Sequence, residues 1–149
     1  MKDRFSDTSS IDKATAYRLL RVARLLRHDL AGALARWDPD LTPEQYFVLF
    51  RLHERDGRAQ RELVDPVLDD RANITRLVDK LQARGLVERR PDPDDGRRNQ
   101  VWLTDAGRAL FDTLLPRIPA ERRRLFGDLA PGELDALHDL LDRLEDRLG

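Results

Sequence analysis

The sequence predicts a mainly helical chain with one short β-hairpin near its middle. Apolar residues recur at helical spacing in the segments 11–37, 71–84 and 131–148. Proline, aspartate and glycine cluster between residues 91 and 96, and a short apolar run lies on each side of them. Two such runs around a cluster of turn-forming residues are typical of a hairpin, so we expect helices, then a hairpin, then helices.

Composition limits the class of protein. The chain has 149 residues, of which 40% are hydrophobic, so we predict a single domain, 1–149, with a buried core. It has no cysteine, which excludes disulfides and thiolate metal sites. It also lacks a stretch approaching the roughly 20 apolar residues that a membrane helix needs, and no N-terminal apolar run resembles a signal peptide. We therefore expect a cytoplasmic protein.

Capping residues mark the first two predicted helices. The first helix covers residues 11–37 and begins at a capping signal, Ser9 to Asp12. The second begins after Thr42, which suits an N-cap, and continues to about Glu54. Pro43 favours this start because proline at the first helical position loses no hydrogen bond.

The next segment has the pattern of two helices joined by a tight turn. A short helix is predicted over 60–67, with Pro66 ending it early. An aspartate at 69 or 70 can cap a longer helix over 71–84, and Gly85 follows at the position that favours glycine. Two helices in this arrangement predict a helix-turn-helix.

A hairpin follows this pair of helices. Its predicted strands are Leu86–Arg90 and Gln100–Leu103, and the charged tip between them contains Gly96. A hairpin directly after a helix-turn-helix predicts a winged helix-turn-helix lobe over residues 42–104. The fold class is therefore mainly α, an α+β winged helix with a two-stranded wing.

Leucine-rich helices are predicted on both sides of this lobe. Thr104 caps the helix that follows the hairpin, and Pro116 and Pro119 predict a kink within it. The segments 11–37 and 105–149 carry more leucine than a small central lobe can cover. We predict that they are dimerisation helices that meet a second copy of the chain.

The second helix of a helix-turn-helix enters the DNA major groove, and the wing reaches the adjacent minor groove or the backbone. On a helical projection, Arg76 and Lys80 lie opposite the apolar stripe, with Asn73 and Thr75 on its flanks. Arginine can bind guanine, asparagine can pair with adenine, and threonine can contact a thymine methyl group or a phosphate. The sequence therefore predicts a DNA-reading face on this helix.

The wing supplies a second group of candidate DNA contacts. Residues 71–98 contain eight Arg and Lys against five Asp and Glu, although the whole chain has a net charge of only -1. Across Gly96, Asp95 can shape the tip and direct Arg97 outward, into a narrow and electronegative minor groove. We expect Arg98 to contact DNA as well. One of the neighbouring pair Arg89 and Arg90 can reach a phosphate, and Arg90 is our candidate.

Three stretches carry a resemblance to a known family: LTPEQYFVL, ITRLVDKLQARGLVERR and DPDDGRRNQVWLTDAGR. From about Leu41 to Leu110 the sequence resembles the MarR (multiple antibiotic resistance regulator) family of transcription regulators. The resemblance implies a dimeric winged-helix repressor or activator that binds double-stranded DNA at a pseudo-palindromic operator. It also implies release from DNA by a small aromatic or anionic effector. Within it, Arg97 is the wing arginine, and the reading face consists of Arg71, Asn73, Thr75 and Arg76.

The resemblance also implies an effector pocket beside the dimerisation helices. The candidate lining residues are the aromatic and histidine side chains Tyr17, His28, Trp37, Tyr46 and His53. Two departures from the family pattern stand out. Pro66 and Leu68 lie where the family has an uninterrupted helix and a glycine turn, and Ala130 lies where a Ser or Thr cap commonly opens the last helix.

Two other classes of function are alternatives to this one. A winged helix can serve as a protein-interaction module without DNA binding, and the near-zero net charge slightly favours that alternative. A small enzyme is the second alternative. The sequence lacks a phosphate-binding glycine loop and a useful histidine–carboxylate pair, and serine occurs only at positions 6, 9 and 10. We predict no enzyme activity, no cofactor and no metal site.

Overall fold

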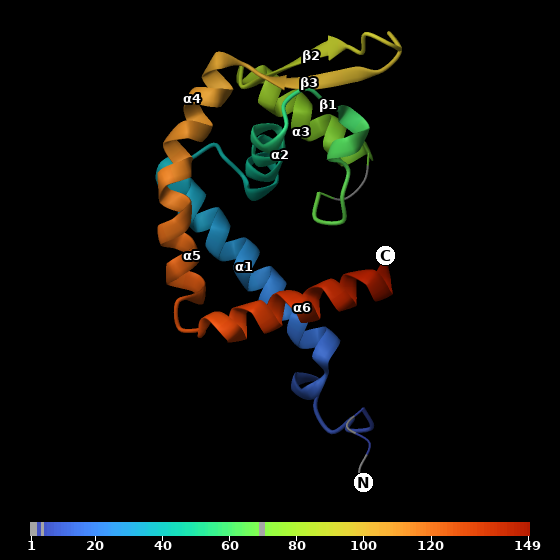
Figure 1. Cartoon of the computed structure of the whole chain (residues 1–149), viewed down its shortest axis with the longest axis vertical. Coiled ribbons are helices and arrows are strands. Elements are labelled where there is room, and N and C mark those ends of the chain that lie inside the picture. The colour runs from blue at the N-terminus through green and yellow to red at the C-terminus, as the bar shows by residue number, and fades with distance from the viewer. Residues whose placement is uncertain (1–2, 4, 69–70) are drawn as a thin grey trace. The chain divides into compact units, whose positions relative to one another are not determined.

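The computed structural model describes residues 3, 5–68 and 71–149, except for the side chain of Arg71. The chain divides into two compact units, Met1–Arg108 and Ala109–Gly149 (Figure 1). The caps predicted at positions 69 and 70 lie outside the described residues. No helix in the described part of the chain is both long and apolar enough to cross a membrane.

The N-terminal helix is shorter than predicted. A 3-10 turn, η1 (Ile11–Lys13), precedes the long helix α1 (Thr15–Trp37). The hydroxyl of Ser10 accepts a hydrogen bond from the N–H of Asp12, and Ala14 is extended with ψ 117°. The prediction of one continuous helix was therefore wrong in its first turn, because the serine cap starts a separate turn that an extended residue ends.

The second helix, α2 (Pro43–Glu54), begins at the predicted cap. Thr42 Oγ1 accepts from the N–H of Gln45, and Gln45 Oε1 accepts from the N–H of Thr42, both at 3.2 Å. These two bonds satisfy backbone donors that the helix itself leaves unpaired. Arg27 of α1 pairs with Glu44 at 2.8 Å, so an ion pair joins the two helices.

The short helix predicted next is only a 3-10 turn, η2 (Gln60–Leu63). Beyond it the carboxylate of Asp65 accepts from the N–H groups of Val67 and Leu68, at 2.8 and 2.9 Å. Pro66 has no N–H to continue a helix. The prediction that the helix reaches residue 67 was wrong, because the aspartate side chain takes the N–H groups that would bond within it.

The helix predicted to read DNA is α3 (Arg71–Ala83). It ends before Gly85, which has φ +72°, and the N–H of Leu86 donates to the carbonyl of Leu81 at 3.0 Å. This is the glycine-terminated helix end that the sequence predicts. The inward face of α3 is buried and apolar, at Ile74, Leu77, Val78 and Leu81.

Three antiparallel strands form the sheet: β1 (Arg58–Ala59), β2 (Val87–Pro91) and β3 (Asn99–Leu103), in the order β1-β3-β2. The wing is the hairpin of β2 and β3, with the register Val87–Leu103, Arg89–Val101 and Pro91–Asn99. The two wing strands agree with prediction to within a residue. β1 was not predicted, because two residues are too few to show an alternating pattern.

The remaining elements are α4 (Asp105–Leu114), η3 (Leu115–Arg117), α5 (Ile118–Phe126) and α6 (Pro131–Leu148). Thr104 caps α4 as predicted, since its hydroxyl oxygen accepts from the N–H of Gly107 at 3.1 Å. The kink predicted from the prolines takes the form of η3, which separates α4 from α5. At α6 the carboxylate of Glu133 accepts from the N–H of Ala130, so the start of this helix is capped without a Ser or Thr.

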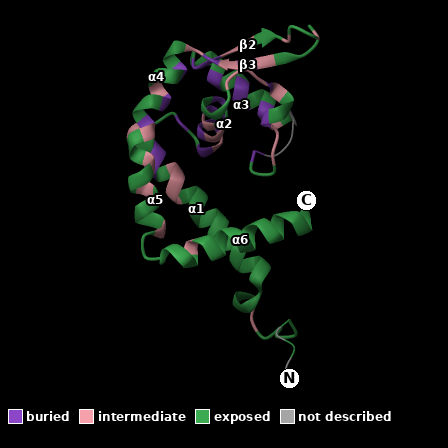
Figure 2. Cartoon of the chain, in the orientation of Figure 1, coloured by how far each residue is buried: buried purple, intermediate pink, exposed green. Residues whose placement is uncertain are grey.

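Two helices expose long apolar faces. Along α1, Leu20 is 71% exposed and Leu25 is 61% exposed. Every residue of α6 except the half-buried Leu134 is exposed, as Figure 2 shows. The helices α2 and α3, by contrast, bury Val48, Leu49, Ile74 and other aliphatic residues almost completely.

The turn before β1 depends on a glycine beneath a tryptophan ring. Gly57 has φ +69°, and a Cβ at this position would lie 2.6 Å from Cε2 of Trp102. Other residues rarely adopt this backbone conformation, and the ring leaves no room for a side chain. Gly57 is therefore required both by its backbone angle and by packing.

We expect Gly57→Ala to lower the free energy of unfolding by about 2 to 4 kcal/mol, from backbone strain and overpacking together. Gly85→Ala shares the positive φ but meets no atom within 4 Å, so it should cost only about 1 to 2 kcal/mol. Gly96→Ala, with neither constraint, should change stability by less than about 0.5 kcal/mol. Urea unfolding of the three variants measures these free energies. Equal losses for Gly57→Ala and Gly85→Ala would show that the Trp102 ring moves aside to make room for the added Cβ.

Candidate nucleic-acid interface

The exposed face of α3 carries two cations without partners. Arg76 and Lys80 are both exposed, and neither side chain forms a hydrogen bond or ion pair with any other described residue. The backbone of Arg71 begins the same helix, but its side chain lies outside the described part. Arg76 and Lys80 therefore keep their hydrogen-bond donors available for an external ligand.

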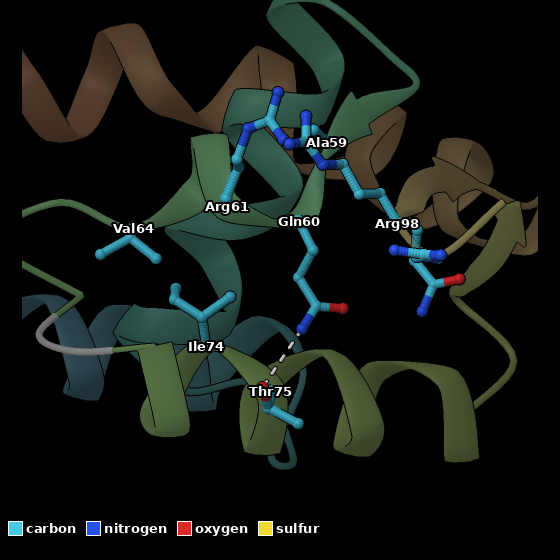
Figure 3. Close-up of a pocket in the computed structure, with 9 residues that line it drawn as sticks. Ala59, Gln60, Arg61, Val64, Ile74, Thr75 and Arg98 are labelled. Atoms are coloured by element: carbon cyan, nitrogen blue, oxygen red, sulfur yellow. Dashed lines mark hydrogen bonds between the residues drawn. The ribbon is translucent and has the colours of Figure 1, made fainter. Parts of the chain in front are cut away.

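The two other predicted reading residues on α3 are already engaged within the protein. Asn73 Nδ2 donates to the carbonyl of Leu68 at 2.8 Å, which ties α3 to the described segment that precedes it. Thr75 Oγ1 accepts from Gln60 Nε2 at 3.2 Å, which joins α3 to η2 (Figure 3). These bonds give both residues a role in holding the helix-turn-helix together.

Two carboxylates shape the tip of the wing. Asp92 Oδ1 accepts from the N–H of Asp94 at 2.8 Å. Asp95 Oδ1 accepts from the N–H of Arg97 at 3.1 Å, and its other oxygen lies 3.4 Å from Nε of Arg98. The guanidinium of Arg97 is exposed and has no partner in the part of the chain that the structure describes. The tip thus presents one free arginine and one that is paired with a surface carboxylate.

Arg89 connects the wing to the helices. From β2 its guanidinium donates to Gln60 Oε1 at 2.9 Å, to Gln82 Oε1 at 3.0 Å and to the carbonyl of Thr75 at 3.3 Å. It also lies 2.7 Å from the carboxylate of Asp79. Only 20% of its side chain is exposed, so these contacts use an arginine that is largely withdrawn from solvent. They fix the wing strand relative to η2 and α3.

Arg90, the neighbour that we predicted as a DNA contact, lies differently. Its guanidinium is 4.7 Å from the centroid of the Trp102 ring and bonds to the carboxylate of Glu88. Trp102 Nε1 in turn donates to Gln100 Oε1 at 3.2 Å. Arg90 is exposed and makes none of the contacts to α3 that Arg89 makes.

A hollow of about 460 Å³ lies between η2, α3 and the wing (Figure 3). Its apolar lining residues are Ala59, Val64 and Ile74. Its polar lining residues are Gln60, Arg61, Thr75, Arg97, Arg98 and Asn99. We call this site the cationic hollow, because three arginines line it and no acidic residue does among those described. The sequence predicted Thr75, Arg97 and Arg98 as site residues and missed Arg61, Gln60 and Asn99.

Arg61 was missed because its surroundings in the sequence are acidic. Residues 42–70 contain four Arg and Lys against seven Asp and Glu. In the structure the adjacent acid, Glu62, is occupied elsewhere: it accepts from the N–H of Ala59 at 3.2 Å and bonds to Arg55. The hydrogen bond from Arg55 holds the pKa of Glu62 below its ordinary value. The charge count therefore does not describe the surroundings of Arg61.

Two of the predicted effector residues line one hollow in the described part of the chain. Tyr17 and His28 line a hollow of about 440 Å³ along α1, together with Leu20, Arg21, Arg24 and Leu25. Trp37, Tyr46 and His53 are not among its lining residues. Tyr46 is buried on α2, where its ring packs edge-on against Phe50, and Phe50 also contacts the ring of His53.

This arrangement defines a class of protein. A helix that presents unpaired cations, a wing with a free arginine at its tip, and a cationic hollow between them form a winged helix-turn-helix built for nucleic acid. Comparison with known proteins gives the family. The model of the MarR family matches residues 40–98.

Relatives and solved structures agree with this match. HTH-type transcriptional repressor NicR of Pseudomonas putida is 37% identical over 120 residues, which cover 80% of this chain and 76% of NicR. CouR of Rhodococcus jostii RHA1, solved with bound p-coumaroyl-CoA, superposes with a TM-score of 0.79 at 28% identity, over 92% of this chain and 95% of CouR. BpsR of Bordetella bronchiseptica, whose DNA binding is regulated by 6-hydroxynicotinic acid, has a TM-score of 0.66 at 30% identity, over 84% and 98% of the two chains.

The chain belongs to the MarR family, and it is a DNA-binding transcriptional regulator rather than an enzyme. The family membership predicted from the three sequence stretches is confirmed. These relatives also favour the DNA-binding regulator over the interaction module without DNA binding.

We expect Arg89→Met to lower the free energy of unfolding by about 1.5 to 3 kcal/mol, because it removes the charge-assisted hydrogen bonds of a guanidinium whose side chain is only 20% exposed. Arg90→Met is the matched control. Because Arg90 itself is exposed, we expect its loss to cost about 1 kcal/mol or less. Guanidinium unfolding of both variants at one pH makes the comparison, and equal losses would show that the contacts of Arg89 add nothing to stability.

Proposed function

We propose that the protein binds a pseudo-palindromic operator as a homodimer, with α3 in the major groove and Arg97 in the flanking minor groove. The observation that carries this proposal is the pair of unpartnered arginines, Arg76 on α3 and Arg97 on the wing, on two elements that Arg89 joins. Arg76 suits guanine in the major groove, and Arg97 suits a narrow minor groove. Lys80, Arg71, Arg90 and Arg98 are proposed as further contacts to this DNA.

Exposed leucines support the homodimer. The apolar face of α6 includes Leu137, Leu140, Leu141 and Leu144, all at least 36% exposed, and α1 exposes a similar face. Apolar surfaces of this extent mark interaction sites in proteins of this size. A two-fold dimer would place two α3 helices in successive major grooves, with half-sites about one duplex turn (~34 Å) apart.

We further propose that the protein is a repressor released by a small aromatic or anionic effector. The repressor NicR and the ligand-responsive regulators CouR and BpsR support this proposal by similarity. In this chain the hollow along α1 combines Tyr17 and His28 with the cations Arg21 and Arg24, a set of side chains suited to an aromatic carboxylate. An effector bound there would release DNA only if it binds better to a dimer geometry that no longer matches the operator spacing.

Selection of bound duplexes from a randomised DNA pool tests the proposal. We expect the purified protein to enrich a pseudo-palindrome whose half-sites lie about one turn apart, because two-fold symmetry in the dimer imposes two-fold symmetry on the site. Enrichment of a single, asymmetric half-site would contradict the dimeric arrangement. No enrichment by ligand-free protein would contradict sequence-specific binding.

Substitutions at Arg76 and Arg97 distinguish the contributions of α3 and the wing to binding of the selected duplex. Arg76→Ala should cost about 1 to 3 kcal/mol of binding free energy and relax the preference at one base position. Arg97→Ala should weaken binding mainly to sites with A/T-rich flanks, where the minor groove is narrow. Arg55→Ala, an exposed arginine paired with Glu62, serves as the control. Unchanged titration curves for Arg97→Ala would exclude the wing from DNA recognition.

A further inference from the structure

The proposed docking places one DNA backbone between α3 and the wing. A duplex has two grooves, and a sugar–phosphate backbone forms the ridge that separates them. If α3 occupies the major groove and Arg97 occupies the adjacent minor groove, this ridge must cross the gap between the two elements. The cationic hollow lies in that gap, since its lining residues come from η2, α3 and the wing.

The hollow has the chemistry of a phosphate site. Arg61 on η2 and Arg98 on the wing are among its lining residues in Figure 3, with Ile74 and Thr75 on the α3 side. The described lining residues contribute three positive charges and no negative charge. Side-chain amides of Gln60 and Asn99 add further polar groups. Arginine is well suited to phosphate because its planar guanidinium can donate two parallel hydrogen bonds.

Among the arginines that line the hollow, Arg61 is available to bind a phosphate. The proposed docking places it in neither the major nor the minor groove. Arg98 is paired with Asp95, and the proposed docking sends Arg97 into the minor groove. The side chain of Arg61 is exposed and forms no hydrogen bond or ion pair with the residues described. Its neighbour Glu62 cannot neutralise it without leaving Arg55 and the N–H of Ala59.

We propose that the cationic hollow seats one phosphate of the DNA backbone and that Arg61 binds it. This inference rests on the proposed placement of α3 and the wing on DNA. It adds a DNA contact from η2, which belongs to neither of those two elements. The contact positions the protein on DNA and is independent of base sequence, because every phosphate is alike.

Titration of the selected operator and of a scrambled duplex, at several salt concentrations, tests the role of Arg61. Loss of one phosphate contact should reduce the slope of log affinity against log salt by about 0.9. In the proposed homodimer, Arg61→Gln removes one contact from each protomer, so it should reduce the slope by about 1.8 and weaken binding to both duplexes roughly thirtyfold at about 0.15 M salt. Arg61→Lys should retain the wild-type slope, because it keeps the charge.

Arg122→Gln is the matched control, since it removes the same charge from an exposed side chain that has no partner among the described residues and does not line the hollow. It should keep the wild-type slope. Neutral methylphosphonates, placed in turn at each symmetry-related pair of backbone positions between the two grooves, then locate the phosphate. At one pair of positions they should weaken the wild-type protein about as much as Arg61→Gln does, and the two changes together should cost no more than either alone.

The outcomes distinguish this inference from the proposed function. Wild-type protein that binds no duplex overturns both. Wild-type protein that binds the operator, with an unchanged slope for Arg61→Gln or losses that add at every methylphosphonate position, overturns the phosphate seat alone. A changed base preference in Arg61→Gln also overturns it, since a phosphate contact carries no base information. Thermal unfolding at the wild-type temperature confirms that the variant is folded.

Discussion

The hydrogen bonds of Arg89 set the geometry on which DNA recognition depends. A wing of two strands has little hydrophobic interior of its own, so its direction must come from contacts with the helices. Arg89 supplies these contacts by joining β2 to Gln60, Thr75, Gln82 and Asp79 at once. Because Gln60 also bonds to Thr75, the same cluster fixes η2 against α3. These contacts fix the separation between α3 and the wing within a single chain.

Internal ion pairs explain how a chain with a net charge of -1 can bind a polyanion. Acidic residues of the first unit pair with arginines of the same unit, as in Asp38–Arg84, Asp56–Arg108 and Asp79–Arg89. Such pairs cancel charge locally and leave Arg61, Arg76 and Arg97 without described partners. The field at a surface depends on the distribution of charge rather than on its sum. Net charge was therefore a poor guide to the partner of this protein.

The long terminal helices give the proposed dimer a means of regulation. DNA binding by two copies depends on the distance between their α3 helices. Within each copy, by contrast, the contacts of Arg89 hold α3 and the wing in a fixed arrangement. A ligand on α1 need not distort the reading residues to act. It need only favour one arrangement of the two copies over another, to the extent of its differential affinity for them.

The sequence alone determined the α2, α3 and α6 helices and the two wing strands, because caps, turn residues and apolar periodicity are local signals that need no tertiary contact. The family came from the resemblance of three sequence stretches. The sequence also identified Arg76 and Arg97 as candidate DNA contacts. Tertiary structure decided which side chains are already engaged. Only the folded chain brings Arg89 to Gln60, 29 positions away, and sets Arg61 beside the wing, because long-range pairing leaves no periodic trace in the sequence.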